Sequence, residues 1–275
     1  MLKIIVWNLA HREESWRRLA EMDADIALVQ EAAPPPPDVA QRIAIDSGPW
    51  KTDGAGCNRP WRTAVVRLSN CVNVEWLEPK AIADAKRGEL AVSRLGTLAV
   101  AIVTPLNGKP LIVASMYAPW EKFHPAAQSR QIYADASAHR VISDLTAFIG
   151  HTHQHRIVAA GDLNILYGYG EHGSTHWASR YGTVFARMAT LGLSFVGPQA
   201  PNGRCAKPWP DELPQTSKNV PTYYTSHQNP TSATRQLDFV FVSKTLKEQM
   251  RVSALNEPDE WGPSDHCRVQ ITLND

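Results

Sequence analysis

Short runs of branched apolar residues recur from one end of the chain to the other and alternate with helical patterns. Such runs are typical of strands that are buried on both faces. They lie at residues 3–7, 25–30, 63–68, 72–77, 98–103, 111–116, 156–160, 236–242 and 268–273. Apolar residues repeat near a 3.6-residue period in segments 14–22, 126–149 and 180–191, which predicts amphipathic helices. The alternation predicts an α/β or α+β protein whose sheets are sandwiched by helices.

No linker divides the sequence into parts. Its 275 residues suit one large domain or two small ones. The four prolines at 34–37 are too few and too early to separate two domains. Residues 198–230 are rich in Pro, Asn, Ser and Thr, which predicts a long irregular loop of the kind that is often functional. We expect a single domain over residues 1–275.

Composition excludes several classes of protein. Hydrophobic residues make up 43% and charged residues 20%, which is ordinary for a folded domain and excludes a mainly disordered chain. Lys and Arg number 28 against 27 Asp and Glu, so a polybasic protein is excluded, although a local basic patch is not. The four cysteines form no CxxC pair, which favours a reducing compartment. With no convincing signal peptide and no long apolar span, we expect a cytoplasmic protein.

Polar side chains stand where the predicted strands end or begin. They are Asn8, Glu31, Tyr117, Asp162 with Asn164, Asp238, and Asp265 with His266. Ligands of sheet proteins gather where strands end and loops begin. An apolar strand also holds its terminal side chain rigidly, as a catalytic site requires.

Each of these residues also has a simpler explanation when it is taken alone. Asn8 could cap a turn, Tyr117 could be a core aromatic, and the GDLN segment at 161–164 could be an Asx turn. For Glu31 a surface-loop role and a functional role are evenly balanced, whereas Asp238 lies between two apolar residues and favours function. All six positions lie at the ends or starts of predicted strands in one chain. This shared placement favours a single site over six separate structural roles.

The donor atoms of this set are mostly oxygens. One Glu, three Asp and two Asn contribute, and no Cys does. Oxygen ligands select hard cations, Mg²⁺ or Mn²⁺, over zinc. Hard cations with few protein ligands usually act on phosphates, so the pattern predicts metal-assisted hydrolysis of a phosphate ester.

Six motifs resemble the endonuclease/exonuclease/phosphatase superfamily, which includes apurinic endonucleases of the exonuclease III type, DNase I-like nucleases, sphingomyelinases and inositol polyphosphate 5-phosphatases. They are WN at 7–8, QE at 30–31, Tyr117, GDLN at 161–164, RQLDFVF at 235–241 and SDHC at 264–267. They occur in the family's order over almost the whole chain. The resemblance implies a DNase I-like, four-layer α/β/β/α sandwich with two central mixed sheets flanked by helices.

The resemblance also implies a role for each matching residue. Glu31 would be the main ligand of the metal ion, with Asn8 and Asp265 lining the same site. Asp162 would orient or deprotonate the attacking water, assisted by Asn164.

Four further residues would act on the phosphate. His266 would contact it, and Asp238 would fix the tautomer of His266 and raise its basicity. Tyr117 would stabilise the developing negative charge, and Arg235 would contact the phosphate. One departure is Ala10, because the apurinic-endonuclease branch typically carries an acidic residue there.

The leading hypothesis is therefore a Mg²⁺- or Mn²⁺-dependent phosphodiesterase that cleaves nucleic acid, with DNA favoured and endo- or exonuclease action left open. A phosphomonoesterase, or a phosphodiesterase acting on a lipid headgroup or small molecule, is the alternative. A catalytically silent binding protein of the same fold is the second alternative. Neither a membrane nor an obligate protein partner is expected.

Several aromatic residues are weaker candidates for substrate contact. Tyr167 or Tyr169, beside the glycine-rich segment 168–173, could stack on a base. Trp61 could lie at the rim of the substrate site. The loop residues Trp209, Tyr223, Tyr224 and Trp261 are interleaved with basic residues and could either bind substrate or pack the loop.

Overall fold

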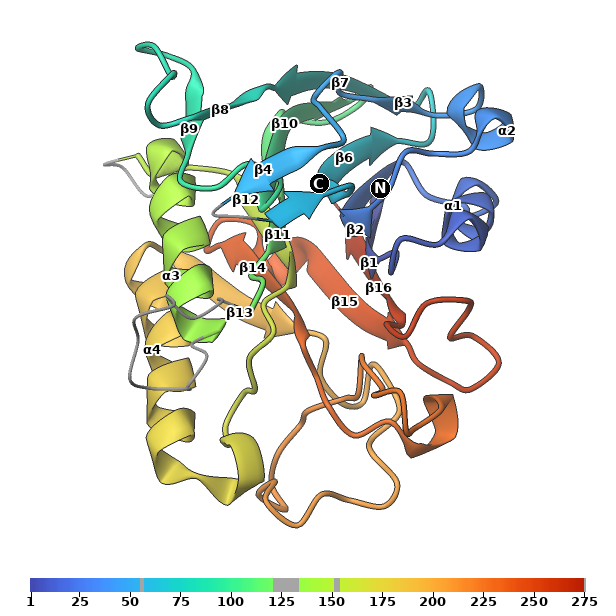
Figure 1. The fold of residues 1–275 in the computed structure, drawn as a ribbon, viewed down its shortest axis with the longest axis vertical. Helices are drawn as coiled ribbons and strands as arrows, with labels where there is room; N and C mark the ends of the chain where they lie inside the picture. The colour runs from blue at the N-terminus through green and yellow to red at the C-terminus, as the bar shows by residue number, and fades with distance from the viewer. Residues whose placement is uncertain (55–56, 121–133, 151–153, 275) are drawn as a thin grey trace.

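Two six-stranded mixed sheets form the centre of the computed structural model, which describes residues 1–54, 57–120, 134–150 and 154–274 (Figure 1). The first sheet has the order β15-β16-β1-β2-β6-β3. Its strands are β1 (Leu2–Asn8), β2 (Ile26–Ala32), β3 (Ala44–Ile45), β6 (Arg62–Arg67), β15 (Met250–Leu255) and β16 (Arg268–Leu273).

The second sheet has the order β13-β14-β12-β11-β10-β7. Its strands are β7 (Val72–Leu77), β10 (Leu98–Pro105), β11 (Leu111–Tyr117), β12 (Ile157–Asp162), β13 (Leu193–Gly197) and β14 (Asp238–Ser243). The β1–β2 and β11–β12 pairs are parallel, and the other pairs in both sheets are antiparallel.

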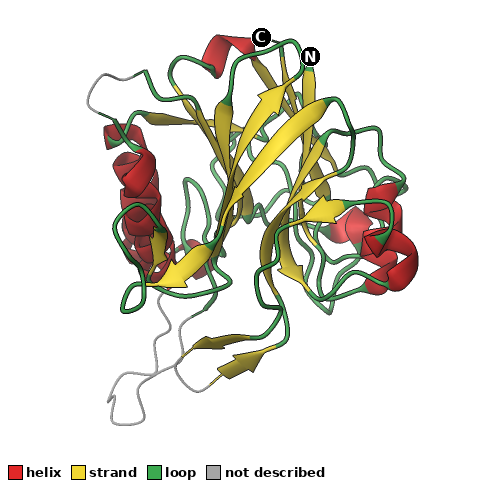
Figure 2. Ribbon diagram, turned by 90° about the horizontal axis from the view of Figure 1, so that it is seen from above, coloured by secondary structure: helices red, strands yellow, loops and turns green. Residues whose placement is uncertain are grey.

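Helices cover the outer face of each sheet, as Figure 2 shows from above. The first sheet is covered by α1 (Glu13–Ala20) and α2 (Pro37–Ala40), and the second by α3 (Ala134–Leu145) and α4 (Thr175–Thr190). Apolar side chains of both sheets meet in a shared core between them. The predicted four-layer α/β/β/α sandwich is confirmed.

Burial on both faces explains why the sequences of the strands are continuous apolar runs. In β1, Ile4 and Val6 point into the core between the sheets, whereas Ile5 and Trp7 pack under α1. Successive side chains of a strand point to opposite faces, so a strand between two layers needs apolar residues at every position.

Short elements complete the chain. They are β4 (Thr52–Gly54), β5 (Cys57–Arg59), β8 (Pro79–Ala81), β9 (Leu90–Val92), η1 (Thr146–Phe148), η2 (Glu171–Gly173), η3 (Pro230–Ser232) and η4 (Lys247–Gln249). Residues 198–229 contain no helix and no named strand, as the sequence predicted. No helix in the described part of the chain is long and apolar enough to cross a membrane.

Two helices differ from their predicted bounds. The α4 helix begins at Thr175 rather than at residue 180, because Ser174 caps it by accepting a hydrogen bond from the Trp177 amide at 3.4 Å. The helix predicted over 126–149 is α3 followed by η1, and its first residues lie outside the described ranges.

Strand pairing brings the predicted site together at one edge of the two sheets. The parallel pair β1–β2 ends with Asn8 opposite Gln30, and Glu31 follows directly. The parallel pair β11–β12 ends at Tyr117 and Asp162, which are partners in register. Asp238 opens β14 directly opposite Asp162. Parallel strands end at the same edge, so residues far apart in sequence become neighbours there.

Candidate active site

Glu31 lies at the end of β2 with both carboxylate oxygens engaged. Its Oε1 atom accepts a hydrogen bond from the Tyr117 hydroxyl at 2.7 Å, and its Oε2 atom lies 2.9 Å from Nε2 of His11. Burial alone would raise the pKa of Glu31. The hydrogen bonds from His11 and Tyr117, with the charge of His11, outweigh burial and lower this pKa below its ordinary value. The carboxylate is therefore ionised at neutral pH.

The backbone around Glu31 has an unusual conformation. Glu31 has φ 44°, and Ala10 and His11 have φ 49° and 60°. Non-glycine residues in this left-handed region are strained and cluster at functional sites. The positive φ angles of Ala10 and His11 place the ring centroid of His11 5.0 Å from that of Trp61. His11 was not predicted from the sequence, where its only signal is its closeness to Asn8.

Asp162 is buried and held by two asparagines. Its Oδ2 atom accepts from Nδ2 of Asn8 at 3.0 Å and from Nδ2 of Asn164 at 3.2 Å, and its Oδ1 atom accepts from the Asn164 amide at 2.9 Å. Burial, and then the charges of Asp238 and Glu31, raise the pKa of Asp162 to about 7 against the opposing charge of His266. This carboxyl can therefore exchange a proton near neutral pH.

The glycine of the GDLN motif is required by close packing behind Asp162. Gly161 has φ 151°, and a Cβ atom there would lie 1.9 Å from the carbonyl oxygen of Met116 on the neighbouring strand. Such a contact cannot be relieved without moving β11. Glycine thus lets β11 and β12 approach closely where they carry Tyr117 and Asp162 into the site.

His266 and Asp238 form a buried pair. Nδ1 of His266 lies 2.9 Å from Oδ2 of Asp238, and its Nε2 faces Oδ2 of Asp162 at 3.8 Å. Burial alone would lower the pKa of His266, but the charges of Asp238 and Asp162 outweigh it and raise the pKa to about 10. The imidazole is therefore cationic at neutral pH and oriented by Asp238.

The WN and SDHC motifs hold each other in place. The Trp7 indole donates to the His266 carbonyl at 2.9 Å, and the Ser264 hydroxyl donates to the Asn8 carbonyl at 2.7 Å. Ser264 also accepts a hydrogen bond from the His266 amide at 3.1 Å. Motifs more than 250 residues apart are thus locked into one unit.

Arg235 lies beside this centre and carries a counter-ion. Its Nη2 atom donates to Oε2 of Glu171 at 2.9 Å. Tyr223 forms an isolated β-bridge with Arg235 and another with His266, and its ring lies 4.9 Å from the imidazole. The segment around Tyr223 therefore connects Arg235 to His266.

Solved structures share this architecture over the whole chain. An AP endonuclease, LMAP, from Leishmania major aligns with a TM-score of 0.62 at 16% identity, covering 100% of this chain and 88% of that one. The endonuclease domain of TRAS1, a telomere-specific non-LTR retrotransposon, aligns with a TM-score of 0.61 at 14% identity, covering 100% and 99%. The 3′ phosphatase NExo from Neisseria, bound to a product DNA hairpin, gives 0.57 at 16%, covering 100% of both chains.

The chain has a DNase I-like fold, which it shares with these solved structures. This likeness establishes the fold alone, because the identities are low. No protein-family model matches the sequence, and no curated protein matches it.

The residues expected to hold a cation in this DNase I-like fold are Glu31, Asn8 and Asp265. Within the described ranges, no group of three or more His, Cys, Asp and Glu side chains is arranged to hold a metal ion. The expected set has only two carboxylates, with an amide as the third ligand. Oδ1 of Asn8 accepts one hydrogen bond, from the Ala10 amide at 3.0 Å, which leaves its second lone pair for a ligand.

This donor set fits a hard cation. Glu31 is ionised beside Asn8, and Asp265 is half-buried with its Oδ1 atom 3.4 Å from the Ser264 hydroxyl. A few oxygen ligands with water filling the other positions is the usual environment of Mg²⁺ in proteins.

Several weaker candidates do not face the site. Tyr169 is 5% exposed, and Tyr167 packs its ring on Phe185 and Phe195, so both residues pack the structure, which the sequence favoured over stacking on a base. Trp261 is fully buried in the loop and packs it rather than binding substrate.

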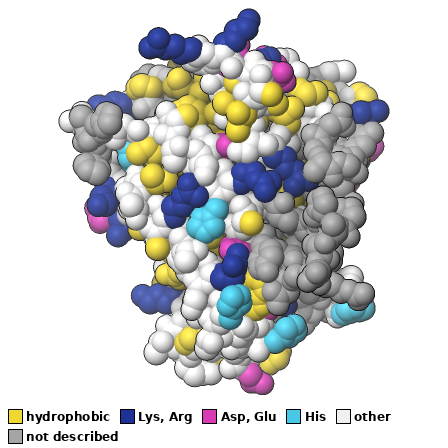
Figure 3. Space-filling view, turned by 60° about the vertical axis from the view of Figure 1, so that its left-hand side comes forward, with side chains coloured by type: hydrophobic (Ala, Val, Ile, Leu, Met, Phe, Trp, Pro, Cys, Tyr) yellow, Lys and Arg dark blue, Asp and Glu magenta, His cyan; other side chains and the backbone are white. Residues whose placement is uncertain are grey.

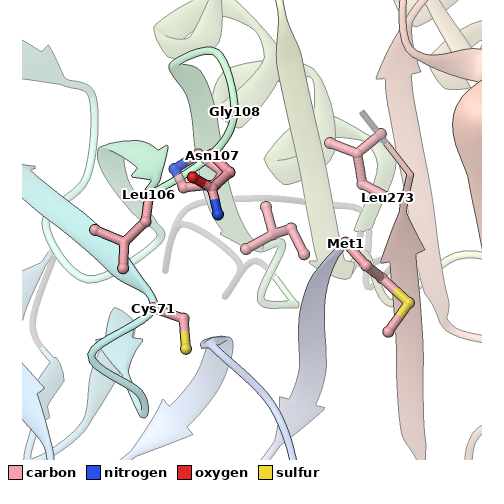
Figure 4. A pocket seen from close by; sticks show the side chains of 8 residues that line it. Met1, Cys71, Leu106, Asn107, Gly108 and Leu273 are labelled. Carbon is pink, nitrogen blue, oxygen red and sulfur yellow. The ribbon is translucent and has the colours of Figure 1, made fainter.

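The pocket shown in Figure 4 also lies away from the site. Met1, Leu2 and Leu273 line it where β1 begins and β16 ends, at the opposite edge of the first sheet from Asn8 and His266. No Asp, Glu, His, Lys or Arg side chain is among the described residues that line it.

Proposed function

We propose that this protein is a divalent-cation-dependent phosphodiesterase that hydrolyses nucleic acid, with DNA as the substrate. The observation that carries the proposal is the buried arrangement of Asp162, His266 and Asp238 beside the ionised Glu31. It combines a carboxyl that can exchange a proton, an oriented cationic imidazole and an oxygen-rich ligand set. In-line attack on a phosphodiester needs a positioned water, charge neutralisation and a stabilised leaving oxygen.

Glu31, Asn8 and Asp265 would hold Mg²⁺ or Mn²⁺. The cation would supply charge neutralisation at the phosphate and the leaving oxygen. Tyr117 and His11 hold the Glu31 carboxylate in place through their hydrogen bonds.

Asp162 accepts the proton of the attacking water. Its pKa near 7 suits a general base at neutral pH. Asn8 and Asn164 fix its orientation by donating to its Oδ2 atom. The water oxygen bonds to phosphorus as the bond to the leaving oxygen breaks.

His266 donates a hydrogen bond from Nε2 to a phosphoryl oxygen. Asp238 accepts a hydrogen bond from Nδ1–H, which fixes the ring orientation, and its charge keeps the imidazole cationic. Arg235 is a second cationic contact for the phosphate backbone.

DNA is proposed because the structural neighbours include AP endonucleases and a 3′ phosphatase bound to a DNA hairpin. A phosphoesterase acting on a small molecule is the second candidate, favoured by the formal charge of +1. On the face shown in Figure 3, Lys and Arg side chains form separate small groups rather than one stripe.

The test compares phosphoesters under one set of conditions. Purified protein with Mg²⁺ or Mn²⁺, with and without chelator, is incubated with supercoiled plasmid, single-stranded DNA, an abasic duplex, RNA, p-nitrophenyl phosphate and bis-p-nitrophenyl phosphate. Chelator-sensitive DNA cleavage is expected, and His266→Ala or Asp162→Asn should lower it by about 10²-fold or more.

Matched controls are His176→Ala and Asp84→Asn, which change exposed residues away from the site. Both should cleave as the wild type does. Hydrolysis of only the small esters would replace DNA with a small-molecule substrate. Absence of any hydrolysis, or full activity in the two site variants, would refute the proposed mechanism.

A further inference from the structure

We propose that Tyr223 is a further catalytic residue, whose hydroxyl donates a hydrogen bond to a non-bridging oxygen of the scissile phosphate. This inference rests on the proposed function. It assigns to a loop residue the stabilisation of negative charge that the sequence predicted for Tyr117.

The hydroxyl of Tyr117 is already engaged. It donates to Oε1 of Glu31 at 2.7 Å. A phenol has one proton to donate, so Tyr117 cannot also donate to a phosphate oxygen while it holds Glu31. The site therefore needs another donor for the charge that develops on the phosphate.

Tyr223 is fixed in place by its backbone neighbours. Its amide donates to the Arg235 carbonyl at 3.1 Å. On either side, the Cys267 amide donates to the Thr222 carbonyl at 2.8 Å, and the Tyr224 amide donates to the Asp265 carbonyl at 3.1 Å. The residue is thus tied to the segment that carries Asp265 and His266, although it lies in a long irregular loop.

The ring of Tyr223 covers His266. The two ring centroids are 4.9 Å apart at an interplanar angle of 48°. The side chain is half-buried, and its hydroxyl has no hydrogen-bond partner within the described part of the chain. A rigidly held phenol beside a cationic imidazole, with its proton unused, is suited to donate to an incoming anion.

The surroundings of the hydroxyl favour its protonated form. Burial and then the charge of Asp265 raise the pKa of Tyr223, with smaller contributions from Asp162 and Glu31, while Arg235 lowers it. The phenol therefore keeps its proton at neutral pH, as a hydrogen-bond donor requires.

The test removes only the hydroxyl. Tyr223→Phe keeps the ring against His266, and its kcat for DNA cleavage should fall by about 100-fold, as for loss of one donor to a developing oxyanion. Tyr224→Phe is the matched control, because that neighbouring ring packs on Trp261 instead, and its kcat should be unchanged. Thermal unfolding should show both variants folded as the wild type is.

A second readout tests the contact itself. In wild-type protein, replacing one non-bridging oxygen of the scissile phosphate by sulfur should slow cleavage in one diastereomer, because sulfur is a poorer acceptor. Tyr223→Phe should reduce this difference between oxygen and sulfur for that diastereomer, whereas a residue that only packs would leave it unchanged.

The outcomes separate this inference from the proposed function. A wild type that cleaves DNA, with Tyr223→Phe equally fast and its sulfur effect unchanged, would refute the role of Tyr223 and leave the proposed function standing. A wild type that hydrolyses no phosphoester would refute both.

Discussion

Nε2 of His266, which lies just before β16 of the first sheet, is 3.8 Å from Oδ2 of Asp162 at the end of β12 in the second sheet. The charge of His266 lowers the pKa of Asp162, and the charge of Asp162 raises the pKa of His266, because each charge favours ionisation of its partner. Burial nevertheless raises the pKa of Asp162 to about 7. The pair is therefore poised to respond to pH in the range where the proposed reaction would run.

The first prediction concerns stability of the cation-free protein. Asp162 binds its proton more tightly when folded than when unfolded, because its folded pKa is raised from 3.8 to about 7. Its contribution to the free energy of unfolding is thus fully present below about pH 4 and is lost as pH rises through about 7. Asp162→Asn should remove this loss, so the stability of the wild type relative to the variant should fall as pH rises from 5 to 8.

Urea denaturation at pH 5, 6, 7 and 8 measures the difference. Asp84→Asn, which alters an exposed carboxyl, should follow the wild type at every pH. If the free energy of unfolding depends on pH in the same way for the wild type and for Asp162→Asn, the pKa of Asp162 is not raised.

The second prediction concerns the residue that orients Glu31. Tyr117→Phe removes the hydrogen bond to Oε1, so the Glu31 carboxylate loses one of its two partners. Loss of a group that orients a ligand weakens metal binding by about 10–100-fold. The Mn²⁺ dissociation constant, measured by electron paramagnetic resonance, should rise accordingly, while Tyr224→Phe leaves it unchanged. Equal Mn²⁺ affinity in both variants would exclude Glu31 as a ligand oriented by Tyr117.

The position of the site could be predicted from the sequence, whereas its full membership could not. Apolar runs that end in Asn8, Glu31 and Asp162 mark strand ends because strands buried on both faces leave few polar positions. The pairing of β1 with β2 and of β11 with β12 then makes those ends converge. The predicted DNase I-like sandwich follows from the same pattern, supported by the resemblance.

The missed features depend on local backbone geometry and on long-range packing. His11 reaches Glu31 through two successive residues with positive φ, which nothing in the sequence WNLAH indicates. Strand β15 escaped prediction because it is partly exposed and only Val252 and Ala254 are buried, so it lacks a continuous apolar run. Tyr223 was a candidate for either substrate contact or loop packing, and the sequence could not decide between them because contacts with distant segments set the course of its loop.

The third prediction concerns the contact that joins the WN and SDHC motifs. The Ser264 hydroxyl is buried, donates to the Asn8 carbonyl and accepts from the His266 amide. Ser264→Ala leaves both backbone groups without that partner, which should lower the free energy of unfolding by about 1–3 kcal/mol. Urea denaturation is the measurement, with the exposed Ser226→Ala as control. A change below about 0.5 kcal/mol would mean that water replaces the hydroxyl.

The last prediction concerns the counter-ion of Arg235. Glu171 neutralises Arg235 at 2.9 Å, and the two side chains are 19% and 34% exposed. Glu171→Gln keeps the size of the side chain but removes the charge that competes with a phosphate for the guanidinium. A partly exposed pair of this kind is worth up to about 1 kcal/mol, so KM for DNA should fall by up to about fivefold.

Salt dependence distinguishes this effect from a change in loop structure. With one more cation available to the phosphate backbone, the slope of log affinity against log salt should steepen by up to about one unit. Affinity for a non-cleaved DNA oligonucleotide in chelator, measured from 50 to 200 mM salt, gives the slope. Glu248→Gln, an equal change in net charge on exposed η4, should alter neither KM nor slope. If Glu171→Gln and Glu248→Gln change KM and the salt slope equally, the effect comes from the net charge of the protein, and Arg235 does not contact the substrate.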